Sequence, residues 1–397
     1  MTGMLFGFLL VCCQKRASAK PTLKAVLMLT RHGDRAPNGV YPKDPYLSFR
    51  WPGGLGALSK KGERQMKMSG SLKAARYKSL LGSIDNSSVN ANIFVLSSSM
   101  ERCFKSARYF LDGFLTGKWN EDLINVLPHE QDEFLLVKGK SCSPYYKTLF
   151  SGCSFEDPDV KNFLKSNNIG SRFFKLLEEK TGLEMTSIGP VFLLDDILSV
   201  QRDNGFPLPK WAYSLYDQYI HPIARFAFDK MSSSDYMQIR SGVLLRDMIE
   251  RLDAVTSDPS RQNIVLYSAH DLTISALMHH MEIIDQCDIK PEYGACFAIE
   301  LYENPDIPDD YQVKLFYFKN YADQHPAEIK LPFSNKLCTF KEFKDLMNPK
   351  VTNDYEKTCS ESRIVSPENT TSQQRIWDLF KESEMQYFKF LLQQLSK

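Results

Sequence analysis

The fold of this chain is constrained most by a repeated order of elements: a short apolar segment, a polar turn and a helical pattern. The segments 24–29 (KAVLML), 92–96 (NIFVL) and 263–267 (NIVLY) are almost continuously apolar, as in strands of a sheet that is covered on both faces. Helical spacing follows the second segment. After the third, a helix is predicted over 272–281 with Asp271 as its N-cap. This order predicts an α/β fold with a mostly parallel sheet flanked by helices.

Two further patterns extend this prediction. Residues 36–58 are rich in proline and glycine and predict a long ordered loop, after which a helix over 59–81 returns to the sheet. Near the other end of the chain, 295–302 and 311–318 alternate between apolar and polar residues, which predicts an antiparallel hairpin.

The middle of the chain differs from both flanks because its signals are mostly helical. Between 156 and 256 the clearest helical patterns cover 160–183 and 237–254. We therefore expect one α/β domain formed by 20–155 and 257–397, with a smaller α-helical subdomain, 156–256, inserted into it.

The first 19 residues have the pattern of a secretory signal. An apolar run of about ten residues, too short to span a bilayer, precedes the small residues Ala17-Ser18-Ala19. No later stretch reaches the length of a membrane span, so no membrane anchor is predicted. We expect a secreted protein, with the lysosomal lumen as the less favoured location. Asn86 and Asn369 lie in glycosylation sequons.

Charge and cysteine content narrow the function classes. The chain has 49 basic and 48 acidic residues, a balance that leaves no field for nucleic acid or an anionic membrane surface. Two of the nine cysteines belong to the predicted signal, and no spacing among the rest is that of a zinc site or redox pair. A few disulfides and one free thiol are expected, with connectivity left open.

The polar residues with the clearest chemical meaning stand where the three predicted strands end. They are Arg31, His32 and Arg35 after the first strand, Arg102 after the second, and His270 and Asp271 after the third. Ligands bind beyond the carboxyl ends of strands in open α/β sheets. Guanidinium groups donate paired hydrogen bonds to phosphate oxygens, so a phosphate is the expected ligand.

The same residues predict phosphoryl transfer. Neighbouring arginines keep the His32 imidazole neutral, so that it can attack phosphorus and form a phosphohistidine. Asp271 would donate a proton to the leaving oxygen and later activate water, while His270 would donate to a phosphoryl oxygen. Because arginines supply the positive charge, no metal or other cofactor is expected.

The segment Arg31–Pro37 (RHGDRAP) matches the RHGxRxP signature of the histidine acid phosphatases, and 268–271 (SAHD) resembles their HD motif. The chain resembles the animal prostatic, lysosomal and insect-venom acid phosphatases more than the phytases. This resemblance implies an α/β domain with a smaller α domain and a small phosphate monoester as substrate. It implies a nucleophilic His32 and a proton donor at Asp271. It also implies phosphate binding by Arg31, Arg35, Arg102 and His270, and it favours a Cys142–Cys359 disulfide.

One stretch departs from the family pattern. The relatives have an arginine-serine-threonine run and two aspartates before the second-strand arginine, whereas this chain has LSSSMER over 96–102. Two alternatives stay open: a phytase or inositol-polyphosphate phosphatase of the same family, and a secreted binding protein of low activity on the same fold. The oligomeric state is open between a monomer and a homodimer.

Overall fold

A computed structural model describes residues 20–82, 92–115, 119–135, 142, 148–258, 260–304, 306–307, 310–332 and 338–360. The predicted signal, 1–19, and both sequon asparagines, Asn86 and Asn369, lie outside these residues. Among the helices within these ranges, none is long and apolar enough to cross a membrane.

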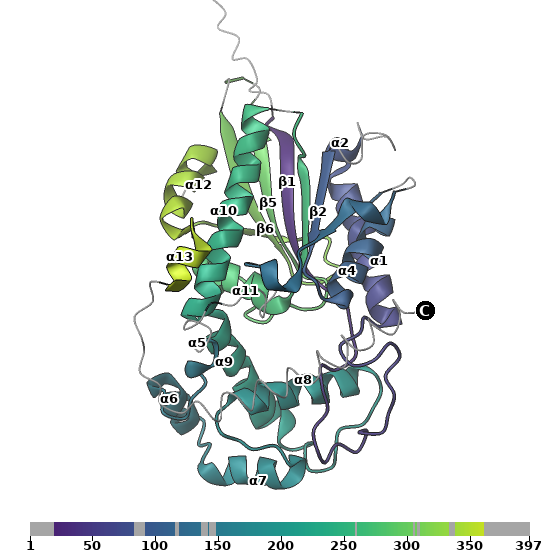
Figure 1. Cartoon of the computed structure of the whole chain (residues 1–397), viewed down its shortest axis with the longest axis vertical. Coiled ribbons are helices and arrows are strands. Elements are labelled where there is room, and N and C mark those ends of the chain that lie inside the picture. Colours follow the sequence, from purple (N-terminus) through teal and green to yellow (C-terminus); the bar gives the residue numbers. More distant parts are fainter. Residues whose placement is uncertain are drawn as a thin grey trace, which may run out of the picture.

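The centre of the molecule is a mixed sheet in the order β3-β2-β4-β1-β5-β6-β7, with β8 paired to β6 (Figure 1). Its strands are β1 (Thr22–Arg31), β2 (Ile93–Ser97), β3 (Ile124–Val126), β4 (Ile264–Ala269), β5 (Cys296–Glu303), β6 (Tyr311–Phe318), β7 (Ala327–Ile329) and β8 (Cys338–Thr339). Strands β3, β2, β4 and β1 are mutually parallel, and β5 and β6 form the predicted antiparallel hairpin beside β1. The predicted α/β fold class is confirmed.

Helices cover both faces of the sheet. The α-helices are α1 (Lys60–Arg76), α2 (Lys78–Leu81), α4 (Glu101–Phe114), α5 (Thr148–Ser151), α6 (Pro158–Ser166), α7 (Ser171–Thr181), α8 (Gly189–Asp203), α9 (His221–Ser232), α10 (Asp235–Ser257), α11 (Asp271–His280), α12 (Phe340–Met347) and α13 (Tyr355–Ser360). Short 3-10 turns are η1 (Glu121–Leu123), η2 (His129–Gln131), η5 (Ile284–Gln286) and η6 (Asn348–Lys350), and η4 (Tyr216–Ile220) is a π-helix.

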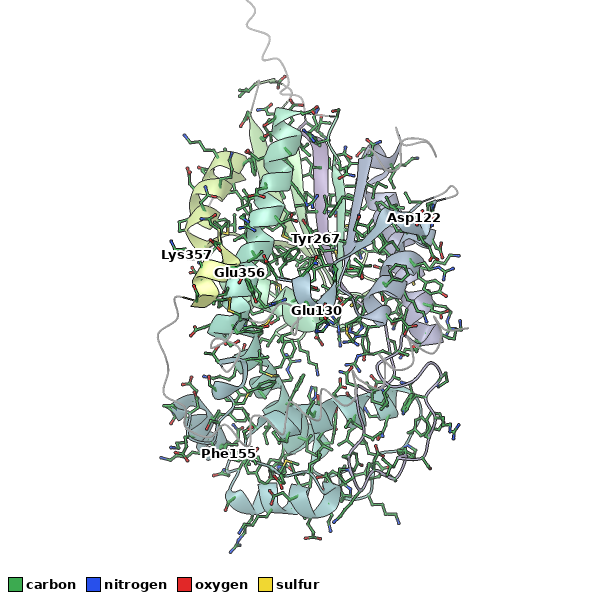
Figure 2. All side chains as sticks on the ribbon, in the orientation of Figure 1. Asp122, Glu130, Phe155, Tyr267, Glu356 and Lys357 are labelled. Atoms are coloured by element: carbon green, nitrogen blue, oxygen red, sulfur yellow. A yellow bond between two sulfur atoms is a disulfide. The ribbon has the colours of Figure 1, made fainter. Side chains whose placement is uncertain are left out.

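The alternation of β1 explains why two layers of helices form. Val26 and Met28 point to the face covered by α1 and α4, whereas Leu27 and Leu29 point to the face covered by α10 and α11. On the second face Tyr267 (Figure 2) donates a hydrogen bond of 2.5 Å to Asp247 of α10. Burial on both faces accounts for the almost continuous apolar sequences of the central strands.

Helices α6 to α9 and the first part of α10 share a second hydrophobic core, which includes Val160, Leu194, Phe228 and Met237. The later part of α10 packs on the sheet instead, so this helix belongs to both cores. The helical pattern over 160–183 corresponds to two helices. It is divided into α6 and α7 where Asn168 adopts a left-handed φ of 53°, which a continuous helix does not permit. We retain 156–256 as the proposed subdomain.

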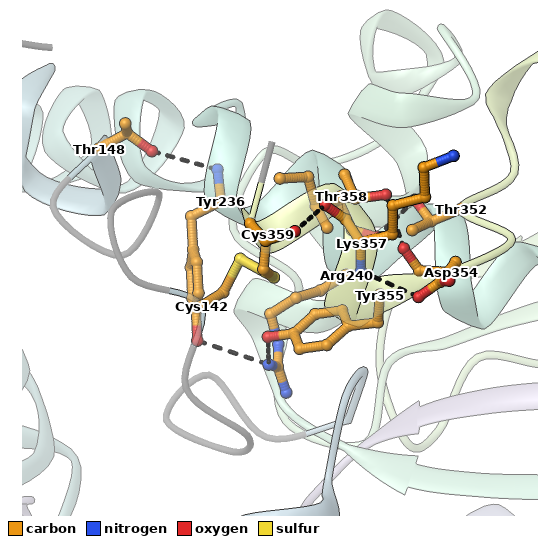
Figure 3. The surroundings of a disulfide bond; sticks show 12 residues. Cys142, Thr148, Tyr236, Arg240, Thr352, Asp354, Tyr355, Lys357, Thr358 and Cys359 are labelled. Carbon is orange, nitrogen blue, oxygen red and sulfur yellow. Dashed lines mark hydrogen bonds between the residues drawn. A yellow bond between two sulfur atoms is a disulfide. The ribbon is translucent and has the colours of Figure 1, made fainter. Parts of the chain in front are cut away.

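A disulfide joins Cys142 to Cys359 of α13, and α10 lies beside it (Figure 3). There the buried Arg240 donates to the hydroxyls of Tyr236 at 3.4 Å and Tyr355 at 3.1 Å. The other cysteines after the predicted signal are thiols: Cys103, Cys153, Cys287, Cys296 and Cys338. The expectation of several disulfides and one thiol is therefore wrong; four of these five thiols are buried within the packed structure.

Candidate active site

The register of the sheet brings three strand ends to the same level. Arg31 of β1 pairs with Ala269 of β4, and Ser97 of β2 pairs with Ser268. The backbone N–H of His32 donates to the Ala269 carbonyl at 3.1 Å. The residues that follow β1, β2 and β4 therefore meet at one edge of the sheet, which faces α8 and α9 (Figure 1).

The turn after β1 is held by the start of α1 and by α4. The Gly33 N–H donates to Ser106 Oγ at 3.1 Å, and the Asp34 N–H donates to Gln65 Oε1 at 2.8 Å. Ser59, the N-cap of α1, donates to the Asp34 carboxylate at 2.5 Å. A Cβ at Gly33 would lie 2.6 Å from the carbonyl oxygen of Gly62. Only glycine allows this approach, and the approach fixes the direction of the side chains on either side of it.

His32 is 2% exposed, and one of its ring nitrogens makes a hydrogen bond to the backbone. Nδ1 lies 2.8 Å from the Gly33 carbonyl. Because a carbonyl oxygen only accepts, Nδ1 carries the proton and Nε2 carries the lone pair. Burial, together with Arg102, Arg31 and Arg35, holds the pKa of His32 well below its usual value of 6.5. Within the described part of the chain, no residue forms a hydrogen bond with Nε2.

Arg31 connects the first and third strand ends. Its Nη2 forms a 2.8 Å ion pair with Asp271 Oδ2, and its Nη1 donates to the Pro291 carbonyl at 2.7 Å. The guanidinium also lies 4.1 Å from the centre of the Tyr293 ring, within cation–π range. Arg31 is therefore held in one orientation from three sides.

Asp271 is the first residue of α11, so the prediction that it is the N-cap is wrong. The N-cap is His270, which makes no side-chain capping bond. Asp271 Oδ1 accepts from the Leu272 N–H at 2.8 Å, while Oδ2 binds Arg31. Burial alone would raise the pKa of Asp271, but Arg31, then Lys290 and Arg35, hold it below its usual value. With only the protein's own charges around it, Asp271 is a carboxylate.

Arg102 and His270 lie together near His32. Arg102 Nη2 is 3.5 Å from His270 Nδ1, and the rings of His32 and His270 are 5.6 Å apart. Because a guanidinium only donates, Nδ1 of His270 accepts, and its Nε2 donates to Ser98 Oγ at 3.1 Å. Burial and Arg102 hold the pKa of His270 well below 6.5. Ser98, from the stretch that departs from the family pattern, thus orients His270, and His270 orients Arg102.

Arg35 has a partner that the sequence reasoning missed. Its Nη2 and Nη1 donate to the two carboxylate oxygens of Asp196 on α8, at 2.7 and 3.3 Å. Burial opposes charge on both groups, but Arg35 lowers the pKa of Asp196 to about 2, and Asp196 raises the pKa of Arg35. A sequence signal existed, because adjacent aspartates interrupt an otherwise apolar helical run, VFLLDDILSV over 191–200. The sequence pattern did not show that Asp196 pairs with Arg35, because the two residues are 161 positions apart.

A family model, the histidine phosphatase superfamily (branch 2), matches residues 22–319. The chain belongs to this family. It is 27% identical over 352 residues to the lysosomal acid phosphatase of Homo sapiens, covering 85% of this chain and 80% of the relative. It is 25% identical over 369 residues to the prostatic acid phosphatase of Homo sapiens, covering 89% of this chain and 92% of the relative.

Among solved structures of this family's fold, the chain is similar to the apo form of Hafnia alvei phytase. The TM-score is 0.63 at 17% identity, and the match covers 87% of this chain and 99% of the phytase. The phytase of Klebsiella sp ASR1 also has a TM-score of 0.63, at 16% identity over 88% of this chain and all of the phytase, 100%. At this identity the likeness supports the architecture alone.

Proposed function

We propose that the protein is a secreted acid phosphatase that hydrolyses small phosphate monoesters, with broad specificity, through a phosphohistidine at His32. The observation that carries this proposal is the environment of His32: a buried imidazole whose Nδ1 donates to the Gly33 carbonyl, with burial and three arginines holding its pKa well below the usual value. Such a ring offers a lone pair at Nε2 to a phosphorus atom whose oxygens the arginines neutralise.

The reaction has two displacements. In the first, the lone pair of His32 Nε2 forms a bond to phosphorus while the ester P–O bond breaks, and Asp271 gives a proton to the leaving oxygen. In the second, water attacks the phosphohistidine and gives a proton to Asp271. The P–N bond then breaks, and orthophosphate leaves together with a neutral His32. Arg31, Arg35 and Arg102 stabilise the charge on the phosphoryl oxygens in both steps. His270 completes this phosphate-binding set when its Nε2–H turns from Ser98 Oγ to a phosphoryl oxygen.

Asp271 must be protonated to act as an acid, although Arg31 and Lys290 favour its carboxylate form. A bound phosphoryl group brings negative charge to Arg31 and competes with Asp271 for that guanidinium. The electrostatic hold on the carboxylate weakens, and the pKa of Asp271 rises. Proton donation is therefore coupled to substrate binding, and a mildly acidic medium favours it.

Two alternatives are separated by substrate tests. Hydrolysis of inositol polyphosphates is the alternative within the family, but the chain's similarity to the phytases above is 16–17% in identity and concerns the fold. We expect lower kcat/KM for phytate than for an aryl phosphate. The other alternative, a secreted binding protein of low activity, predicts phosphate binding without turnover.

The decisive experiment is acid-quench trapping of labelled phosphate on the purified protein during turnover of a labelled aryl phosphate. We expect label in wild type and none in His32→Ala, together with loss of hydrolysis and a retained melting temperature. The matched control is His325→Ala, which removes an exposed histidine from the 319–326 loop and should label as wild type does. Unchanged turnover in His32→Ala would remove the proposed nucleophile, and absence of both label and turnover in wild type would favour the binding protein.

A further inference from the structure

Lys290 comes from the segment that holds Arg31, the partner of the proposed proton donor Asp271. Pro291, the next residue, accepts a hydrogen bond from Arg31, and Tyr293 stacks on the same guanidinium. The Lys290 side chain is 16% exposed, with its ammonium 5.3 Å from the centre of the Phe192 ring on α8. The sequence motifs contain neither Lys290 nor its partner.

That partner is Asp195, the neighbour of Asp196 on α8. Asp195 is 1% exposed, and its Oδ1 accepts from Tyr216 at 2.8 Å and from His221 Nδ1 at 3.0 Å. These two short bonds hold the carboxylate in place. Lys290 Nζ lies farther away, 3.4 Å from Oδ2.

The length of the Lys290 contact separates two roles for this lysine. A lysine recruited only to neutralise a buried carboxylate is expected at about 2.7–2.9 Å, the range of charge-assisted hydrogen bonds. Among the described residues, Asp195 is the sole acceptor of a hydrogen bond from Lys290, and the distance is long. The ammonium therefore retains donor capacity for a further anion.

The position of Lys290 indicates which part of a substrate this anion belongs to. Lys290 precedes Pro291, whose carbonyl binds the guanidinium that also pairs with Asp271, and its ammonium lies 3.4 Å from Asp195 of α8. It therefore lies between the Arg31–Asp271 pair and α8. Asp271 is the group that gives a proton to the leaving oxygen in the proposed function. Groups attached to that oxygen thus lie near Lys290, whereas the transferred phosphoryl group lies near the three arginines.

Asp195 is the carboxylate that forms an ion pair with Lys290. Asp271 pairs with Arg31 and Asp196 with Arg35, so the remaining donor hydrogens of the Lys290 ammonium are open to a further anion. We propose that Lys290 forms a second anion-binding position on the leaving-group side, so that the enzyme prefers monoesters whose leaving group carries a carboxylate or similar anionic oxygens near the ester. This inference rests on the proposed phosphatase function and deepens it.

The test compares two alkyl monoesters that differ in one group. In 3-phosphoglycerate a carboxylate stands where glycerol 3-phosphate has a hydroxymethyl group. We expect wild type at pH 5 to show a higher kcat/KM for 3-phosphoglycerate. In Lys290→Met the ratio of the two kcat/KM values should fall by about tenfold, the effect of removing one charged hydrogen bond. Lys161→Met, which removes a lysine paired with Glu156 on the surface of α6, should leave the ratio unchanged.

Lys290→Gln is the second variant, because it keeps a donor to Asp195 and removes only the charge. It should lower the ratio as Lys290→Met does, and Lys290→Arg should preserve it. A wild-type ratio at or below one, or a ratio in Lys290→Gln within twofold of wild type, overturns the anion-binding position. Failure of wild type to hydrolyse either ester or an aryl phosphate would instead reject the phosphatase function itself.

Discussion

We predict that Asp196→Asn lowers the stability of the folded protein but raises the affinity of the site for phosphate. Asp196 is buried and binds Arg35 through both oxygens. Asparagine has nearly the same shape but no charge, so Arg35 would stay buried without its counter-charge. Breaking a buried ion pair on one side costs about 3 kcal/mol. The lowering of the Asp196 pKa from 3.8 to about 2 corresponds to roughly 2 kcal/mol at 1.36 kcal/mol per pKa unit.

We therefore expect Asp196→Asn to lose about 2–3 kcal/mol in free energy of unfolding at pH 6, measured by urea denaturation. Because the pKa of folded Asp196 lies below its unfolded value, the carboxylate stabilises wild type fully above about pH 4 and progressively less as pH falls towards 2. The difference between wild type and variant should shrink over that interval.

Phosphate binding should change in the opposite direction. Without Asp196, the charge of Arg35 acts on a bound phosphate alone, so orthophosphate should inhibit the variant at lower concentration than wild type. The control is Asp217→Asn, an exposed aspartate 3.8 Å from Arg202, which should change stability by less than about 0.5 kcal/mol. A loss below about 1 kcal/mol in Asp196→Asn, independent of pH, would refute this account of the Arg35–Asp196 pair.

Three further outcomes follow from the site. Asp271→Asn should reduce turnover of alkyl phosphates more than that of aryl phosphates, since poor leaving groups need the proton; equal losses in steady-state kinetics would remove Asp271 from the acid role. Gly33→Ala should abolish turnover and lower the melting temperature, because its Cβ would meet the Gly62 backbone at 2.6 Å; a stable, active variant would show that this approach is not required. The pKa of His32 is held well below 6.5, so kcat/KM should not fall as pH drops through 6.5. A loss in that range would mean that His32 takes up a proton there and that its pKa is not lowered.

Much of the fold was predictable from local patterns. The three central strands β1, β2 and β4 and the hairpin of β5 and β6 follow from apolar runs and alternation within a few residues. The break between α6 and α7 was missed because a left-handed Asn168 leaves the apolar spacing on either side of it intact.

The sequence by itself determined which chemistry is available: arginines, a histidine and an aspartate at the ends of buried strands. Only the tertiary structure decided which charged or hydrogen-bonding partner each of these groups has. Asp196 reaches Arg35 across 161 residues, Asp195 reaches Lys290 across 95, and Ser98 reaches His270 across 172. Backbone periodicity is local and can be read along the chain, whereas the energy of a buried charge depends on neighbours that only packing brings together.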